Sequence, residues 1–393
     1  MPGLGIAQII AWGSLYYSIS VLAAAIGAEL ALSPSGVFGA FSLGLAMSGV
    51  AAPAAGRAID RFGGRRVLAA GSVVAAVALW WMSRAASAVE YYLAWCVGGV
   101  AMAMTLYDAA FATLSHHFGT SYRKALTALT LFGGFASTVF WPLSQLGLAQ
   151  LGWRDTLLAF AALQVAVCLP LHAWLIPPGC GPAPAAPAVG GAAPPRARVA
   201  PLSGRFVALA AAFALNAFII SAVSAHLIGL LTGSGVAPVD VVWIAALIGP
   251  MQVAGRVLEI TAGRNLRPVT TAVAAFSLFF IGLLALAAVS GPRAGMALAF
   301  AVLYGLANGV MTIVRGTIPA ALFGRDAYGS LLGRLAAPAF AAKAAAPVML
   351  ASLAAPHVAP GGSLALLLAL AAASFVLFLV AIRRRPDGRR ADA

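Results

Sequence analysis

Among the ionisable side chains inside the long apolar runs of this 393-residue sequence, four have a chemistry that needs an explanation. Three are basic, Arg256, Arg315 and Lys343, and one, Asp108, is acidic. A charge inside an apolar helix costs several kcal/mol unless it faces a wet cavity or a partner. Cations that face one cavity attract an anion, and a buried carboxylate can exchange a proton or pair with a cation. The sequence therefore points to a polar site inside an apolar bundle.

Lys343 is the strongest candidate because it lies among alanines near the middle of its run, beyond the reach of either surface. We expect it to face a substrate; the alternative is a structural partner such as Asp108. Arg315, in the inner half of its run, is as well suited to a structural ion pair as to anion binding. Asp108, the only acid well inside an apolar run, could exchange a proton or stay ionised beside an arginine of the other half.

Uncharged polar side chains in the same runs are further candidates for lining the site. They are Tyr16, Tyr17, Asn216, His226 and Asn308. The alternatives are hydrogen bonds between helices and, for the tyrosines, packing at the membrane interface. His116 and His117 have no third metal ligand nearby, the three cysteines form no metal-ligand spacing, and no nucleophile motif is found. We therefore expect no enzyme, no cofactor and no metal site.

The elements that position these residues are twelve apolar runs, which predict an all-α polytopic membrane protein. The chain is 62% apolar and only 9% charged, far beyond what a soluble core needs. The predicted helices cover residues 4–28, 36–53, 67–82, 91–114, 125–148, 152–176, 205–231, 239–262, 269–290, 295–322, 330–355 and 363–382. Pro338 and Pro347 are expected to interrupt the helix of Lys343, leaving backbone groups free to line a cavity.

The distribution of the basic residues predicts the orientation. If the chain starts in the cytoplasm, seventeen of the 24 lysines and arginines fall on the cytoplasmic side, three on the outer side and four inside helices. This asymmetry follows the positive-inside rule of a bacterial-type inner membrane, with both termini in the cytoplasm. It also accounts for the net charge of +14 through the lipid bilayer, without a nucleic-acid partner. We expect the protein to act as a monomer.

A charged motif at residues 56–66, between the second and third runs, reveals an internal repeat. Its residues recur 199 positions later, where Gly56, Arg57, Asp60, Gly64 and Arg65 correspond to Gly255, Arg256, Glu259, Gly263 and Arg264. A repeat of half the chain predicts two pseudo-symmetric six-helix halves. The boundaries are residues 1–176 and 204–383, with a proline-rich cytoplasmic linker at 177–203 and a basic cytoplasmic tail at 384–393.

The motif itself resembles the loop signature of the major facilitator superfamily. Gly56, Asp60, Arg61, Gly63, Arg65 and Arg66 fill every position of the pattern glycine, three residues, aspartate, arginine, any residue, glycine, any residue, two arginines. The second copy departs from it at Ile260 and Ala262. The resemblance implies alternating access, with gating roles for Gly56, Arg57, Asp60, Arg61, Gly63, Arg65, Arg66, Gly255 and Glu259. Arg256 is then either a gate residue or a substrate contact.

A second resemblance concerns the substrate. The stretch Tyr16-Tyr17-Ser18-Ile19-Ser20-Val21, the turn Gly152-Trp153-Arg154 and one basic residue in each of helices eight and eleven look like the oxalate:formate antiporters and monocarboxylate transporters. In that branch the arginine and the lysine contact substrate carboxylates, roles that would fall on Arg256 and Lys343. This chain lacks the helix-one lysine that some monocarboxylate transporters carry.

These observations predict a secondary active transporter for a small organic anion, a monocarboxylate or dicarboxylate, working by proton symport or by exchange for a counter-anion. The alternative is a proton-coupled efflux antiporter for drugs or amphipathic metabolites, with a more apolar pocket and Asp108 as the coupling group. A membrane receptor usually adds a large soluble domain, and an intramembrane enzyme needs convergent catalytic groups. The sequence shows neither.

Overall fold

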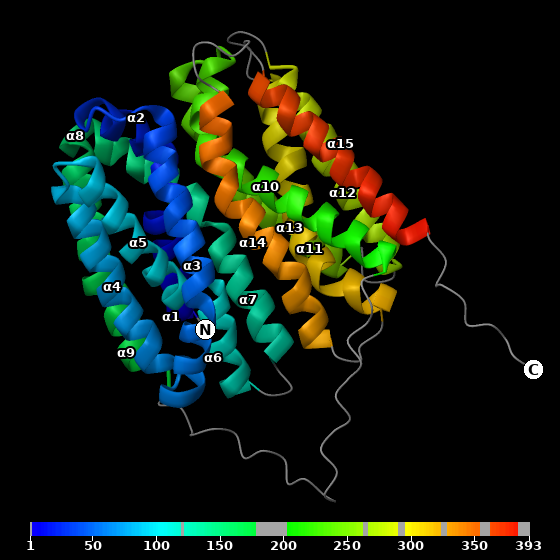
Figure 1. Ribbon diagram of the computed structural model, residues 1–393, viewed down its shortest axis with the longest axis horizontal. Helices are drawn as coiled ribbons and strands as arrows, with labels where there is room; N and C mark the ends of the chain where they lie inside the picture. Colours follow the sequence, from blue (N-terminus) through cyan, green and yellow to red (C-terminus); the bar gives the residue numbers. More distant parts are fainter. Residues whose placement is uncertain are drawn as a thin grey trace, which may run out of the picture.

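The computed structural model describes residues 2–118, 122–177, 203–261, 266–289, 295–323, 328–353 and 362–383 (Figure 1), and every regular element among them is a helix. The first half of the chain contains α1 (Pro2–Trp12), the π-helix η1 (Gly13–Tyr17), α2 (Ile19–Glu29), α3 (Pro34–Phe62), α4 (Gly64–Arg84), α5 (Ala88–Thr105), α6 (Tyr107–Phe118), α7 (Tyr122–Gly134), α8 (Ala136–Leu163), the π-helix η3 (Gln164–Cys168) and α9 (Leu169–Leu175). The second half contains α10 (Gly204–Gly233), α11 (Pro238–Thr261), α12 (Pro268–Ala287), α13 (Gly295–Phe323), α14 (Tyr328–Leu353) and α15 (Gly362–Arg383).

The number of membrane crossings depends on one glycine. Eleven stretches of the described residues are long and apolar enough to cross a membrane, and one of them, Ala128–Leu175, has 48 residues. A single helix of that length would measure about 72 Å, more than twice the bilayer core of about 30 Å. Gly152 lies inside α8 with φ 80° and ψ 170°, a conformation that reverses the chain. Divided there, the described chain crosses twelve times, which confirms the prediction.

The first and fourth crossings are less regular than the sequence predicts. The first contains η1, and the fourth breaks at Leu106, whose ψ is −169°. Side chains from other helices stabilise both irregular segments. Gln8 Nε2 donates a hydrogen bond of 2.6 Å to the carbonyl of Thr105, the last residue of α5. Gln164 Nε2 of η3 donates to Ser14 Oγ of η1 at 2.9 Å, so the two π-helices are joined.

The motif of residues 56–66 lies mostly in helix rather than in a loop. Helix α3 continues through Pro53 to Phe62, nine residues beyond its predicted end, and α4 begins at Gly64. Only Gly63 leaves the helical conformation, with φ 82° and ψ 149°, which a residue without Cβ adopts without strain. Ile59 is almost fully buried in this segment, and its apolar contacts with the start of α4 explain why the helix extends this far.

Helix α14 also differs from expectation, because it continues unbroken through Pro338 and Pro347. The expected interruption around Lys343 is therefore not seen.

The two halves lie side by side, one blue to teal and the other green to red in Figure 1. Helix α3 packs on α14, and α8 packs on α11. In the second pair, Thr138 Oγ1 donates to the carbonyl of Ala246 at 2.8 Å. A Cβ on Gly249 would meet Thr138 and the carbonyl oxygen of Gly134, so glycine permits this close approach.

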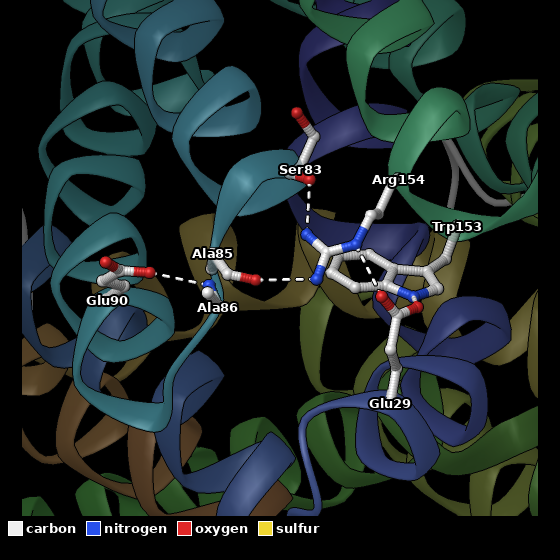
Figure 2. A network of polar contacts seen from close by, with 7 residues as sticks. All are labelled: Glu29, Ser83, Ala85, Ala86, Glu90, Trp153 and Arg154. Atoms are coloured by element: carbon white, nitrogen blue, oxygen red, sulfur yellow. Dashed lines mark hydrogen bonds and ion pairs between the residues drawn. The ribbon is translucent and has the colours of Figure 1, made fainter.

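We call the end of the molecule that carries Gly63 and Arg383 the basic end, and the end that carries the α2–α3 connection and Gly152 the turn end. At the turn end, Arg154 ties three helices of the first half together (Figure 2). Its guanidinium donates to Glu29 Oε1 at 2.7 Å, to the Ser83 carbonyl at 2.7 Å and to the Ala85 carbonyl at 2.8 Å. Trp153 Nε1 donates to the other oxygen of Glu29 at 2.5 Å. The turn Gly152-Trp153-Arg154 thus joins α2, α4 and α8.

This network predicts that Arg154→Ala destabilises the protein. The variant loses three hydrogen bonds of about 0.5–1.5 kcal/mol each, and the partial exposure of the ion pair lowers the total to about 1–3 kcal/mol. Melting temperatures of the purified protein in detergent measure the loss. Arg84→Ala is the matched control, since Arg84 is exposed at the same end. Equal melting temperatures for the two variants would contradict the structural role of Arg154.

The α8–α11 contact generates a second prediction. Gly249→Ala places a methyl group 2.6 Å from the Gly134 carbonyl oxygen, so the helices must separate, at a cost of about 1–3 kcal/mol. Gly229→Ala is the control, because no atom lies within 4 Å of the added Cβ and alanine favours the helix. Thermal unfolding should show a lower melting temperature for Gly249→Ala alone. A decrease of the same size in both variants would be inconsistent with a close contact at Gly249.

Candidate functional site

Lys343 of α14 reaches across from the second half to aromatic rings of the first. Its Nζ lies 5.2 Å from the ring centroid of Trp12 and 4.8 Å from that of Tyr16. These distances are typical of cation–π contacts. Among the described side chains, no carboxylate forms an ion pair with Lys343. The ammonium group is therefore stabilised by cation–π contacts with two aromatic rings and not by an ion pair.

A second cation, Arg315 of α13, lies within electrostatic range of Lys343. Its Nη2 donates a hydrogen bond of 3.0 Å to Oδ1 of Asn216, which is fully buried on α10. This bond fixes the orientation of the guanidinium plane. Two cations held near each other in an apolar bundle repel one another unless an anion lies between them or beside them.

The groups around these two cations present hydrogen-bond donors that are not used. Four of their buried polar atoms have no hydrogen-bond partner in the described part of the chain: Trp12 Nε1, Asn216 Nδ2, Tyr304 Oη and Arg315 Nε. Tyr304 is close enough to Arg315 to interact with it electrostatically. A buried polar atom without a partner costs about 1–3 kcal/mol. A small ligand with several acceptor oxygens would satisfy donors of this kind.

The two tyrosines of η1 lie in the interior of the molecule. Tyr16 is 3% exposed, and its hydroxyl lies close to Ser221 and Ser224 of α10. Tyr17 packs edge-on against Tyr16, with ring centroids 5.2 Å apart, and against Trp141 at 5.4 Å. The structure therefore places Tyr16 beside Lys343, with Tyr17 next to it.

Asp108 stands in the first turn of α6, directly after the break at Leu106. Its side chain is exposed, and it lies within electrostatic range of Lys343 on the opposite half. The preceding residue, Tyr107, contacts Trp12 with ring centroids 5.1 Å apart. The acid and the amine thus face each other across the halves without direct ion-pair contact.

Arg256 lies beside Tyr107 and within electrostatic range of Tyr17, and not, as Arg315 does, within range of Lys343. It is 3% exposed on α11, and its Nη1 donates to the carbonyl of Thr130 on α7, in the other half. The same nitrogen lies 3.4 Å from the position that a Cβ on Gly134 would occupy. Arg256 therefore belongs to the contact between the halves, and Arg315 is the arginine near Lys343.

The remaining predicted residues lie at other positions. His226 Nε2 donates to the carbonyl of Pro347 at 2.8 Å, and its ring lies 3.9 Å from the ring of Phe38 on α3. Asn308 is half-buried on α13, about 10 Å along the helix from Arg315.

The motif residues gather at the basic end. Arg57, Asp60, Arg61 and Arg66 are exposed there, and Arg65 is half-buried. Gly255 of the second copy lies against the backbone of Leu306 on α13, and Glu259 is half-buried one turn further along α11. Gly263 and Arg264 are outside the described residues, as are residues 178–202 of the predicted linker, the tail and Cys180.

Sequence reasoning missed Trp12, Tyr304 and Ser221. Trp12 stands four residues before Tyr16, which places both on one face of the first crossing. That spacing was the available signal, but an aromatic residue in an apolar run usually marks the core. Tyr304 and Ser221 carry no pattern that distinguishes them from other polar residues between packed helices.

A twelve-crossing helical bundle with charged residues at its centre is the architecture of a membrane transporter, and comparison with known proteins identifies the family. Residues 4–292 match the family model of the Major Facilitator Superfamily, and the chain belongs to that superfamily. This confirms the resemblance carried by the motif of residues 56–66 and the all-α polytopic fold predicted from the apolar runs. It also defines an integral membrane transporter, not an enzyme.

Solved structures agree with the fold. The crystal structure of a point mutant of the nucleoside transporter NupG aligns with a TM-score of 0.73, covering 97% of each chain at 13% identity. A bacterial homologue of the human lysosomal transporter Spinster, in an inward-facing and occupied conformation, aligns with a TM-score of 0.70, covering 98% of each chain at 14% identity. A Thermoproteus tenax protein, described as an uncharacterized 38 kDa protein in the 23S RNA operon, is 27% identical over 318 residues, 80% of this chain and 78% of its own.

Proposed function

We propose that the protein is a secondary active transporter that moves a small organic anion, a monocarboxylate or dicarboxylate, by alternating access. The observation that carries this proposal is the pair of neighbouring cations, Lys343 and Arg315, without a described carboxylate in ion-pair contact with either. A carboxylate substrate would accept charge-assisted hydrogen bonds from both. It would also meet the unused donors of Trp12, Asn216 and Tyr304.

In this proposal Arg315, rather than Arg256, is the second cation of the site. Arg256 already donates to the Thr130 carbonyl at the contact between halves, and a gating role fits that position. Asn216 orients Arg315, and the rings of Trp12 and Tyr16 form the apolar wall beside Lys343. Three residues lie further from Lys343 and would line the substrate path or the contact that closes it: Tyr17, Asn308 and His226.

Asp108 is the proposed proton-coupling group. While the site is empty, the field of Lys343 favours the ionised carboxylate. When a substrate anion takes the lysine, that support weakens and Asp108 takes up a proton. This sequence of events gives symport of an anion with a proton. If Asp108 stays ionised throughout, exchange for a counter-anion is the coupling mode.

We propose that the site opens toward the basic end. On α3, Val50 is 74% exposed, and no atom of the described residues lies within 4 Å of a Cβ added to Gly49 or Gly56. At the turn end, α3 contacts α14 and α2 contacts α10. By the positive-inside rule the basic end faces the cytoplasm of a bacterial-type inner membrane. Both termini, the linker 177–203 and the gating motifs then lie on that side of a monomeric carrier made of halves 1–176 and 204–383.

A proton-coupled efflux antiporter for drugs or amphipathic metabolites is the second candidate. The aromatic groups of Trp12, Tyr16 and Tyr107 favour it, because they would pack against a flat apolar solute, and Asp108 would exchange the proton.

Proteoliposome uptake tests the anion proposal. Labelled formate, oxalate, pyruvate and succinate are the probes, and we expect uptake of at least one. Lys343→Ala removes a charge-assisted bond of about 1.5–3 kcal/mol, so the ratio kcat/KM for that anion should fall about 10- to 150-fold. Lys343→Arg should retain part of the activity. Transport of neutral or cationic amphiphiles that is insensitive to Lys343→Ala, without transport of any carboxylate, would support the efflux antiporter instead.

The two arginines can be distinguished kinetically. Arg315→Ala should raise KM for the transported carboxylate about tenfold or more, because it removes a direct contact. Asn216→Ala should raise KM less, since it only releases the guanidinium. Arg256→Ala should change kcat with little effect on KM, as expected for a residue between the halves. The reverse pattern would assign the substrate contact to Arg256.

A further inference from the structure

Pro347 stands four residues after Lys343 in α14, and this spacing removes one backbone hydrogen bond at the lysine although the helix continues. Proline has no backbone N–H, so the carbonyl of Lys343 loses the donor that an α-helix supplies from four residues ahead. The hydroxyl of Ser221 on α10 replaces it, donating to the Lys343 carbonyl at 2.8 Å. The backbone that carries the ammonium group is therefore held by a side chain of another helix.

Two more backbone groups of the same turn are engaged in this way. The carbonyl of Pro347 accepts from His226 Nε2, also on α10, at 2.8 Å. The N–H of Val348 donates to Ser42 Oγ of α3 at 3.2 Å. We call residues 343–348 the opened turn. Two of its three bonds come from α10, in the same half, and the third comes from the other half.

The opened turn connects the proposed binding site with the contact between the halves at the turn end, and a carrier must couple the two. At its start, Lys343 holds the rings of Trp12 and Tyr16. At its end, the Ser42 bond and the contact between the rings of Phe38 and His226 connect α3 to the second half, toward the turn end. Figure 1 shows α14 between α3 and α10, where one short segment can receive bonds from both.

We propose that Ser221, His226 and Ser42 are positioning residues of the carrier that act through the opened turn. Ser221 and His226 fix the backbone at Lys343, and Ser42 makes closure at the turn end depend on that same backbone. A displacement of Lys343 then strains the Ser42 bond, and the halves separate at the turn end. This inference extends the proposed function, but its closure element exists whatever the substrate is.

Distances between spin labels test the closure without any added anion. The labels are placed on Ala28→Cys at the end of α2 and Thr232→Cys at the end of α10, both exposed, in a chain whose three native cysteines are alanine. We expect Ser42→Ala to raise the ratio of separated to closed molecules roughly 2- to 12-fold, the effect of losing one hydrogen bond. Ser42→Thr keeps the hydroxyl and should restore the original ratio.

Ser72→Ala is the matched control, because Ser72 is a fully buried serine whose bond to His172 stays within the first half. If Ser42→Ala changes the distances no more than Ser72→Ala does, the closure role is overturned.

The role of Ser221 is tested by restoring the missing donor. In Pro347→Ala, residue 347 gains an N–H that can bond to the Lys343 carbonyl, so Ser221 is no longer needed there. Ser221→Ala should therefore raise the separated fraction in the native background and have no effect in the Pro347→Ala background. Ser374→Ala is the control, since Ser374 Oγ donates to the Ala212 carbonyl of α10 away from the proline.

An equal effect of Ser221→Ala in both backgrounds would overturn the proposal. Failure of carboxylate uptake alone would leave these distances unchanged, so the two proposals fail separately.

Discussion

The rest of this molecule is arranged around one constraint: at the centre of an apolar bundle lies an ammonium group that no carboxylate of the described residues contacts. Lys343 belongs to the second half, and the rings that receive it belong to the first. A cation in such a place must be compensated by partners that other helices supply. Arg315 adds a second cation and so makes the compensation harder. In the proposed function an anion completes this site, and the completed state would involve both halves.

Irregular backbone concentrates in the helices that carry this site. The first crossing has a π-helix where Tyr16 stands, the fourth breaks two residues before Asp108, and α14 loses a helical donor at Lys343. In a bilayer each freed backbone group needs a partner from the protein. Gln8 donates a hydrogen bond to the Thr105 carbonyl in the fourth crossing, and Ser221 donates one to the Lys343 carbonyl in α14. Both bonds come from side chains of other helices, so the backbone at these places depends on contacts between helices.

The sequence predicted what depends on composition and local pattern. Long apolar runs gave twelve crossings, and the residues of the motif identified the superfamily, because both signals are contained in neighbouring positions. It could not show which of Arg256 and Arg315 lies near Lys343, because that depends on which helices pack together. Arg256 donates to the Thr130 carbonyl and Arg315 donates to Asn216, and these partners are 126 and 99 residues away along the sequence. Trp12 was missed because its role also depends on a contact between distant residues. From the sequence, an aromatic ring that packs in the core cannot be told from one that makes a cation–π contact with a lysine. The end of α3 was predicted at residue 53 but lies at Phe62, because charged residues can extend a helix as readily as they can form a turn.

The magnitudes of the competing contacts explain how such a site can release what it binds. A cation–π contact in a desolvated place is worth about 2 kcal/mol, and a hydrogen bond to a charged group about 1.5–3 kcal/mol. In the proposed function, Lys343 would therefore exchange its ring contacts for a carboxylate at a small net gain in free energy. A single strong ion pair with a carboxylate of the protein would instead hold the lysine too tightly, because breaking a buried pair costs about 3–5 kcal/mol. Near-balance between the empty and the occupied site is what alternating access requires, and aromatic partners provide it where an acidic partner in direct contact would not.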